Sequence, residues 1–173
     1  MVIIISGASH SGKTILAQHL LEQKKWPTLS IDHLKMGLIR SHQTDLTVYD
    51  TQELTDYLWP IVREMIKTVI ENDQNLIVEG LYIPYDFQDD FDDEYLKHIK
   101  HVWLVLSQNY LDNHFEQVVN HSNIIEKRLV EDENLKERIK RDNQINLENV
   151  KKFNLNYVLI NDDYQEEIKK ASF

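Results

Sequence analysis

The fold of this chain is decided by the segment Val2-Ile3-Ile4-Ile5-Ser6-Gly7-Ala8-Ser9-His10-Ser11-Gly12-Lys13-Thr14. Its β-branched start predicts a short strand over Val2–Ile5 that is buried on both faces. Residues 7–14 match the pattern G-x-x-x-x-G-K-[ST] in full, and apolar residues at helical spacing follow as far as Lys24. Because a strand precedes this loop and a helix follows it, we predict a phosphate-binding loop.

The residue types of the loop indicate its chemistry. Gly7 and Gly12 allow backbone conformations and a close approach that a Cβ atom would oppose. Successive backbone N–H groups can then surround phosphate oxygens at the positive end of the following helix. Lys13 is expected to reach the β- and γ-phosphates, and the Thr14 hydroxyl to bind Mg²⁺. We therefore predict a site for ATP and Mg²⁺ that is made of Gly7, Ala8, Ser9, His10, Ser11, Gly12, Lys13 and Thr14.

Strands and helices alternate along the rest of the chain. We expect further strands at residues 29–31, 75–78, 101–106 and 157–160, and helices at 14–24, 50–71, 110–127 and 134–152. Pro60 predicts a kink in the long helix or two consecutive helices. This order indicates βαβ units, with ligands at the carboxyl ends of parallel strands. We predict one α/β domain over residues 1–173, with a five-stranded parallel sheet and helices on both faces.

Composition argues against several classes of protein. A chain of 173 residues, 42% hydrophobic and 28% charged, is typical of one soluble globular domain. The formal net charge of −10 argues against a nucleic-acid-binding surface and an anionic-membrane surface, because both need a positive face. The absence of cysteine excludes disulfides and thiolate metal sites. The first apolar run has no basic flank before it, so we expect no signal peptide and a cytoplasmic location.

Further motifs separate the classes of nucleotide-binding protein. A GTPase switch ordinarily carries D-x-x-G and N-K-x-D, and neither pattern occurs in the sequence. A motor ATPase usually needs a larger core than 173 residues and an arginine finger for a neighbouring subunit. The size and the polar residues that follow the predicted strands favour a small-molecule kinase.

Three segments carry a resemblance to a known family. They are residues 7–14, Ser30-Ile31-Asp32-His33-Leu34-Lys35-Met36-Gly37-Leu38-Ile39-Arg40, and Leu76-Ile77-Val78-Glu79-Gly80. Together they resemble the small P-loop kinases, a group that includes adenylate and shikimate kinases, chloramphenicol phosphotransferase, zeta toxins and 2-phosphoglycerate kinase-like proteins. The resemblance implies a three-layer P-loop fold with a small helical lid, and transfer of the γ-phosphoryl group of ATP to a small acceptor.

The resemblance also assigns residues to the acceptor. Asp32 matches an acid that holds the acceptor hydroxyl and can take its proton, although a helix N-cap is the alternative role. Arg40 and Arg63 match contacts to an acceptor phosphate. Lys35 lies on the same segment as Arg40, and a solvated helix face is the alternative for each of these side chains. Because adenylate kinase has no acid matching Asp32, the pair of Asp32 and Arg40 favours a hydroxyl acceptor that also carries an anionic group.

Glu79 ends the third strand, where the family has an acid that could hold a Mg²⁺-bound water or a substrate hydroxyl. A carboxylate at a buried strand end is costly unless it is used or paired. Gly80 is expected to let the substrate approach the backbone, and Tyr82 either lines the acceptor pocket or packs in the core. Residues 86–94 form the strongest acidic run, but the calcium-loop pattern is not met, so we expect a solvated loop that leads into a helix.

A lid is expected over residues 122–141, with Arg128, Arg138 and Arg141 as the arginines that spread transition-state charge on closure. An ordinary surface pair between Glu137 and Arg141 at i,i+4 spacing is the alternative. Arg128 is the arginine that we expect to be catalytic, together with Lys13 and Asp32. The residues 161–162 fall where relatives form part of the adenine pocket.

These observations together predict an ATP-dependent phosphotransferase whose acceptor is a small hydroxylated metabolite, phosphorylated or not. One alternative is a nucleoside monophosphate kinase, in which Arg40 and Arg63 would bind the acceptor and Asp32 would be structural. A second alternative is an ATP-binding regulator that hydrolyses ATP slowly and signals through a partner. A toxin-like role also stays open, because zeta toxins share the fold and phosphorylate a sugar nucleotide.

Overall fold

The computed structural model describes residues 1–125 and 134–171 of the chain. Its strands form a five-stranded sheet in the order β2-β3-β1-β4-β5. The pairs β1–β3, β2–β3 and β4–β5 are parallel. This confirms the predicted α/β fold with a parallel sheet. The strands are β1 (Val2–Gly7), β2 (Thr28–Ser30), β3 (Leu76–Glu79), β4 (Ile99–Leu106) and β5 (Tyr157–Ile160).

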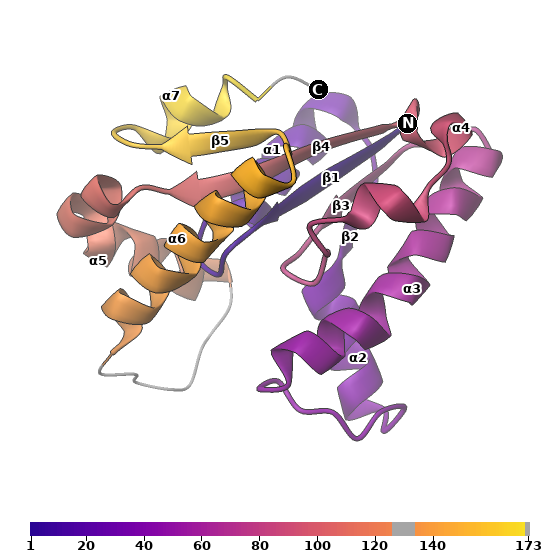
Figure 1. The fold of residues 1–173 in the computed structure, drawn as a ribbon, viewed down its shortest axis with the longest axis horizontal. Helices are drawn as coiled ribbons and strands as arrows, with labels where there is room; N and C mark the ends of the chain where they lie inside the picture. The colour runs from indigo at the N-terminus through magenta and orange to yellow at the C-terminus, as the bar shows by residue number, and fades with distance from the viewer. Residues whose placement is uncertain (126–133, 172–173) are drawn as a thin grey trace. The chain divides into compact units, whose positions relative to one another are not determined.

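Helices connect these strands, as the labels of Figure 1 show. The long predicted helices occur within a few residues of their expected bounds. The short helix α4 follows the acidic run, where a helix was expected, whereas the 3₁₀ turn η1 and the short helix α7 were not located by sequence, because four or five residues are too few to establish a helical period. The helices are α1 (Lys13–Lys24), α2 (Ile31–Arg40), α3 (Thr51–Glu71), η1 (Phe87–Asp90), α4 (Asp93–Leu96), α5 (Gln108–Ile125), α6 (Leu135–Lys152) and α7 (Tyr164–Ile168).

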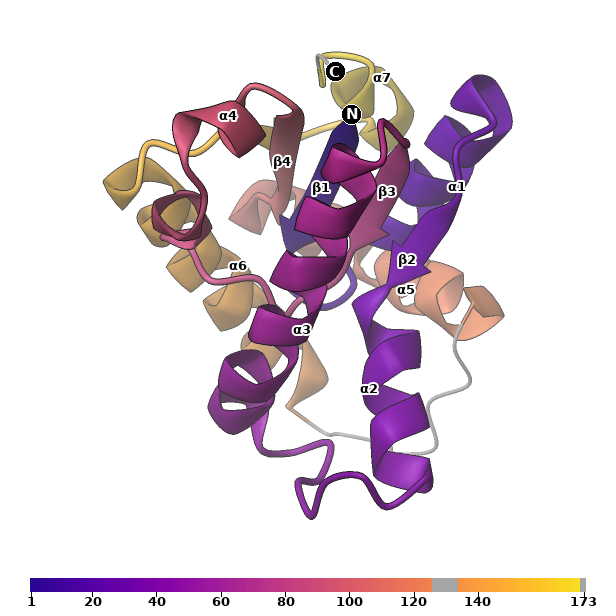
Figure 2. The same ribbon diagram turned by 90° about the vertical axis from the view of Figure 1, so that its right-hand side faces the viewer.

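The contacts divide the chain into two compact units. The first unit contains Met1–Ser6 and Thr14–His101, and the second contains Gly7–Lys13 and the described residues from Val102 onward. In the first unit, α2 packs against α3 and β2 (Figure 2). In the second unit, α7 packs on β5, and α5 packs on α6.

Helix α3 continues through Pro60 as one helix, so the alternative of two consecutive helices is wrong. Proline removes a backbone donor and frees the carbonyl one turn earlier. Pro60 is exposed, so water can satisfy that carbonyl. Leu58, Trp59 and Val62 are buried on both sides of the proline, and their packing favours the continuous helix.

A buried asparagine connects α6 to β4 in the second unit. Asn143 is fully buried, and its side-chain oxygen accepts a hydrogen bond of 2.8 Å from the Leu106 N–H. Its amide nitrogen donates to the Ile139 carbonyl at 2.9 Å. Both ends of the side-chain amide are therefore satisfied, which is what allows a polar side chain at this depth.

Candidate functional site

The phosphate loop leaves no room for side chains at its two glycines. Gly7 has φ +142°, and a Cβ there would lie 2.4 Å from the Leu104 carbonyl oxygen. Gly12 has φ +89°, and a Cβ there would lie 2.4 Å from the Tyr164 hydroxyl oxygen. His10, between the two glycines, also has a left-handed backbone at φ +68°. The loop is therefore held in a conformation that few residue types adopt.

Polar groups of the loop fit a polyphosphate. The Lys13 ammonium is buried and donates to the Ala8 carbonyl at 2.9 Å. Within the described residues, the buried Ser11 hydroxyl has no hydrogen-bond partner. A buried hydroxyl without a partner in a native protein is rare and calls for an explanation, such as a ligand or water that satisfies it. These groups, the backbone of the loop and the start of α1 offer the donors that phosphate oxygens accept from.

A hydroxyl and a carboxylate form a hydrogen bond in the first unit. The Thr14 hydroxyl, one residue after Lys13, donates to Glu79 Oε2 at 3.3 Å. Glu79 pairs in register with Ile5 of β1 and Ser30 of β2, and it is only 3% exposed. Oxygen donors of this kind suit Mg²⁺, which takes one or two protein ligands and completes its shell with phosphates and water. Thr14 and Glu79 are therefore the residues that would hold Mg²⁺.

Asp32 belongs to the first turn of α2 and does not cap that helix. The N-cap is Ser30, and the Asp32 carboxylate instead accepts from the Lys35 ammonium at 2.5 Å. Lys35 also donates to the Tyr82 hydroxyl at 3.0 Å and lies 4.9 Å from the centre of the Tyr82 ring. The three side chains form what we call the Asp32 cluster: Asp32, Lys35 and Tyr82.

Burial distinguishes the Asp32 cluster from a solvated helix face. The Lys35 side chain is 11% exposed and that of Asp32 is 26% exposed, while Tyr82 is buried. Burial by itself would lower the pKa of Lys35, but the Asp32 charge and the hydrogen bonds to Asp32 and Tyr82 outweigh it, so the pKa is raised. Lys35 is thus a charged partner for Asp32 at neutral pH. Sequence reasoning selected all three residues but did not connect them.

The absence of a side chain at Gly80 leaves space for Ile31 at the start of α2. A Cβ at Gly80 would lie 2.7 Å from Ile31 Cβ and 3.0 Å from Ile31 Cδ1. Ile31 is fully buried and is the first residue of α2, directly before Asp32. The role that the structure gives to Gly80 is therefore to admit Ile31, and through it to position the start of the helix that carries Asp32.

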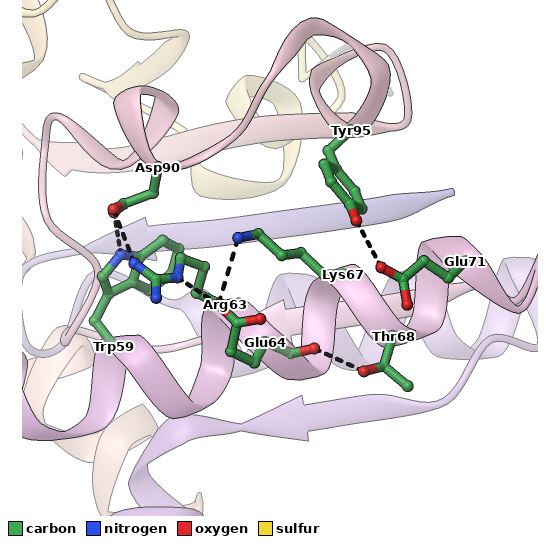
Figure 3. Close-up of polar contacts among 8 residues, drawn as sticks. All are labelled: Trp59, Arg63, Glu64, Lys67, Thr68, Glu71, Asp90 and Tyr95. Carbon is green, nitrogen blue, oxygen red and sulfur yellow. Dashed lines mark hydrogen bonds and ion pairs between the residues drawn. The ribbon is translucent and has the colours of Figure 1, made fainter.

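The two predicted acceptor arginines have different surroundings. Arg40 is exposed in the last turn of α2. Arg63 on α3 donates to Glu64 at 2.8 Å and to Asp90 at 3.1 Å, and the Trp59 indole N–H donates to the same Asp90 carboxylate at 2.6 Å (Figure 3). Arg63 therefore connects α3 to η1, and its contact with an acceptor phosphate stays a prediction.

The predicted lid lies partly outside the described residues. Arg128 belongs to residues 126–133, which the structure does not describe. Arg138 and Arg141 belong to the first turns of α6, and Arg141 lies 3.7 Å from the Asp142 carboxylate. Beside them, the Lys140 ammonium lies 2.5 Å from Asp112 of α5. The lid arginines stay a prediction.

Tyr164 contacts the phosphate loop and was missed by sequence reasoning. It is the first residue of α7, and its hydroxyl donates to the Gly12 carbonyl at 2.8 Å. A lone tyrosine 152 residues from its partner carries no motif, so no local pattern could have found it. Burial, with a smaller effect of Tyr110, raises the pKa of the Tyr164 phenol, so the hydroxyl keeps its proton over the physiological range.

Two features are absent from the described residues. No group of three or more His, Cys, Asp or Glu side chains there could hold a metal ion. Across the same residues, no helix has both the length and the apolarity that crossing a membrane requires.

Comparisons with known proteins define the fold. No protein-family model and no curated protein matches the chain. Among solved structures, deoxyadenosine kinase from M. mycoides has a TM-score of 0.55 at 12% identity, over 98% of this chain and 95% of that one. Shikimate kinase from Bacteroides thetaiotaomicron has a TM-score of 0.53 at 18% identity, over 98% and 92%. A gluconokinase from Sinorhizobium meliloti has a TM-score of 0.50 at 13% identity, over 97% and 87%. The chain therefore has the fold of the small P-loop kinases.

Proposed function

We propose that this protein is an ATP-dependent phosphotransferase that moves the γ-phosphoryl group to a hydroxyl of a small metabolite. The phosphate loop binds the polyphosphate of ATP, and Thr14 with Glu79 holds Mg²⁺. Asp32 orients the acceptor hydroxyl. The three fold neighbours are named as kinases, which supports the reaction class and leaves the acceptor open.

One observation carries the proposal: the hydrogen bond between Thr14 and Glu79 in the first unit, at the strand end whose register partner, Ser30, is followed by Asp32. Thr14 is hydrogen-bonded to Glu79, and Glu79 is in register with Ser30, two residues before Asp32. Chemistry at the carboxyl ends of neighbouring parallel strands is the usual arrangement of open α/β sheets. A buried acid beside a hydroxyl suits a metal ion, and a second, partly exposed acid suits a hydroxyl nucleophile.

The reaction requires little covalent chemistry from the protein itself, because the phosphoryl group passes directly from ATP to the acceptor. The acceptor oxygen forms a bond to the γ-phosphorus while the bond from that phosphorus to the β–γ bridging oxygen breaks, and ADP leaves. The proton of the acceptor hydroxyl passes to Asp32, which must be ionised and correctly placed beforehand. The Lys35 ammonium holds one oxygen of the Asp32 carboxylate at 2.5 Å. Mg²⁺, when bound, neutralises charge on the phosphates.

The acceptor that fits best also carries an anionic group. Arg40 is exposed on the same helix as Asp32, and no ion pair is seen for it in residues 1–125 and 134–171. An exposed guanidinium can bind a carboxylate or phosphate with two parallel hydrogen bonds. Hydroxylated acids and sugar phosphates are therefore the first acceptors to test.

The test is ADP release from the purified protein with ATP or GTP and Mg²⁺, over a panel of hydroxylated acids, sugar phosphates, aminoglycosides and nucleoside monophosphates. Wild-type protein is compared with Lys13→Ala and Asp32→Asn, and with Asp73→Asn as the matched control. Asp73 is exposed in the turn after α3 and has φ +52°, a conformation that asparagine tolerates well.

Strong stimulation by one hydroxyl compound is expected, with loss of about 100-fold or more in Asp32→Asn and none in Asp73→Asn. Stimulation only by a nucleoside monophosphate, retained in Asp32→Asn, would replace the proposal with a nucleoside monophosphate kinase. Slow ADP release that no acceptor changes would instead favour an ATP-hydrolysing regulator.

A further inference from the structure

The contact between α7 and the phosphate loop suggests that the C-terminal part of the chain takes part in nucleotide binding. The Tyr164 hydroxyl donates to the Gly12 carbonyl at 2.8 Å, and three atoms of the Tyr164 side chain lie within 2.4–2.6 Å of where a Cβ of Gly12 would be. The tyrosine therefore covers one side of Gly12 and holds its carbonyl. Both residues belong to the second unit.

Tyr164 is itself well anchored. It directly follows Asp163, whose carboxylate caps α7 by accepting from the Glu166 N–H at 2.9 Å. Ile168 at the other end of α7 is buried, and the helix packs on β5. The hydroxyl is thus presented to the loop by a capped and packed helix rather than by a free tail.

Holding a carbonyl also orients an N–H group. The Gly12 carbonyl and the Lys13 N–H belong to one planar peptide unit, in which they point in opposite directions. Glycine adopts positive and negative φ with similar ease, so the peptide next to Gly12 can change its direction at little cost. A hydrogen bond on the carbonyl removes that freedom. The Lys13 N–H at the start of α1 then keeps one direction.

We propose that Tyr164 is a positioning residue for the nucleotide: by holding the Gly12 carbonyl, it pre-orients the Lys13 N–H toward the phosphates of the bound nucleotide. The inference rests on the proposed nucleotide site and adds a residue to it. Pre-orientation raises affinity because the loop loses less freedom when the phosphates bind. The effect acts on phosphate binding and is independent of the base.

The test compares Tyr164→Phe with wild type by calorimetric titration with Mg²⁺·ADP and, separately, with Mg²⁺ and inorganic tripolyphosphate. The loss of one hydrogen bond is expected to weaken both ligands by a similar factor, about three- to tenfold. Tyr157→Phe is the matched control, since Tyr157 is on β5 in the same unit and is 38% exposed. Its affinities are expected to equal those of wild type.

Each other outcome overturns the inference in a recognisable way. Unchanged affinities in Tyr164→Phe would show that the hydrogen bond positions nothing. Weaker binding of ADP with unchanged tripolyphosphate would assign Tyr164 to a base pocket instead. Wild-type protein that binds neither ligand would remove the proposed function together with the inference. If Tyr164→Phe unfolds, the same titrations are made in the Gly37→Ala background, where helix α2 is expected to be more stable.

Discussion

The fit between Gly80 and Ile31 allows a sharp test of how the site is positioned. A Cβ added at Gly80 would lie 2.7 Å from Ile31 Cβ, a distance that real Cβ atoms essentially never show. The atom in the way is at the root of the Ile31 side chain, so a change of rotamer cannot move it. Gly80→Ala therefore requires the start of α2 to shift, and Asp32 with it.

The size of the effect follows from two opposing contributions. Overpacking by one methyl group in a close-packed core costs about 1–3 kcal/mol. The change from glycine to alanine also lowers the conformational entropy of the unfolded chain, which stabilises the folded protein by about 0.4–1 kcal/mol. We expect a net loss of about 1–2 kcal/mol in the free energy of unfolding, which lowers Tm by about 2–8 °C in a protein of this size.

Gly37→Ala is the matched control. Gly37 lies inside α2, and nothing lies within 4 Å of where its Cβ would be. The same chemical change should therefore stabilise the protein, by about 0.5–1 kcal/mol. Urea unfolding followed by circular dichroism measures both variants, and the phosphotransfer assay measures activity. Activity should fall in Gly80→Ala at temperatures where the variant is fully folded. A Gly80→Ala protein as stable as Gly37→Ala would refute the reasoning.

Three further predictions concern single side chains. Lys35→Met should lower kcat by about tenfold or more and leave the KM for ATP unchanged, because Asp32 loses the partner that orients it, and Lys35→Arg should restore part of kcat in the same assay. Asn143→Ala should cost about 1–3 kcal/mol in urea unfolding, because the Leu106 N–H loses its acceptor in the core; an unchanged midpoint would contradict this. Burial lowers the pKa of His101 below its ordinary 6.5. As the pH falls, the unfolded chain therefore takes up this proton at a higher pH than the folded protein does. Its contribution to stability should be complete above about pH 6.5 and be lost as the pH falls toward the folded pKa, and this acid-side loss should shrink in His101→Phe.

The outcome at Pro60 shows why sequence reasoning was incomplete for the helices. Proline is a reliable signal for the loss of one backbone hydrogen bond, and on that ground either a kink or two consecutive helices were expected. Whether the helix breaks depends on what its neighbours bury. Leu58 and Val62 are fully buried and Pro60 is exposed, so the packing outweighs one lost hydrogen bond. That balance is a property of the folded protein.

The role of Asp32 also depends on contacts that only the folded protein shows. Its place after a short strand identified it as a candidate from sequence, but capping a helix and binding a hydroxyl were both open. The structure removes the capping role, since α2 begins before Asp32 and the carboxylate meets Lys35. Tyr82, 47 residues beyond Lys35, completes the cluster. A pattern within one segment cannot reveal a partner contributed by another.

The sequence by itself determined the phosphate loop, because all of its signals are local. The strand before it, the two glycines, the lysine and the threonine are consecutive, so their spacing reports their geometry directly. Only the tertiary structure decided what surrounds those residues. Tyr164 reaches Gly12 across 152 residues, and Ile31 occupies the space that Gly80 leaves free. Such contacts depend on how the strands and helices pack, because packing brings together residues that share no local pattern.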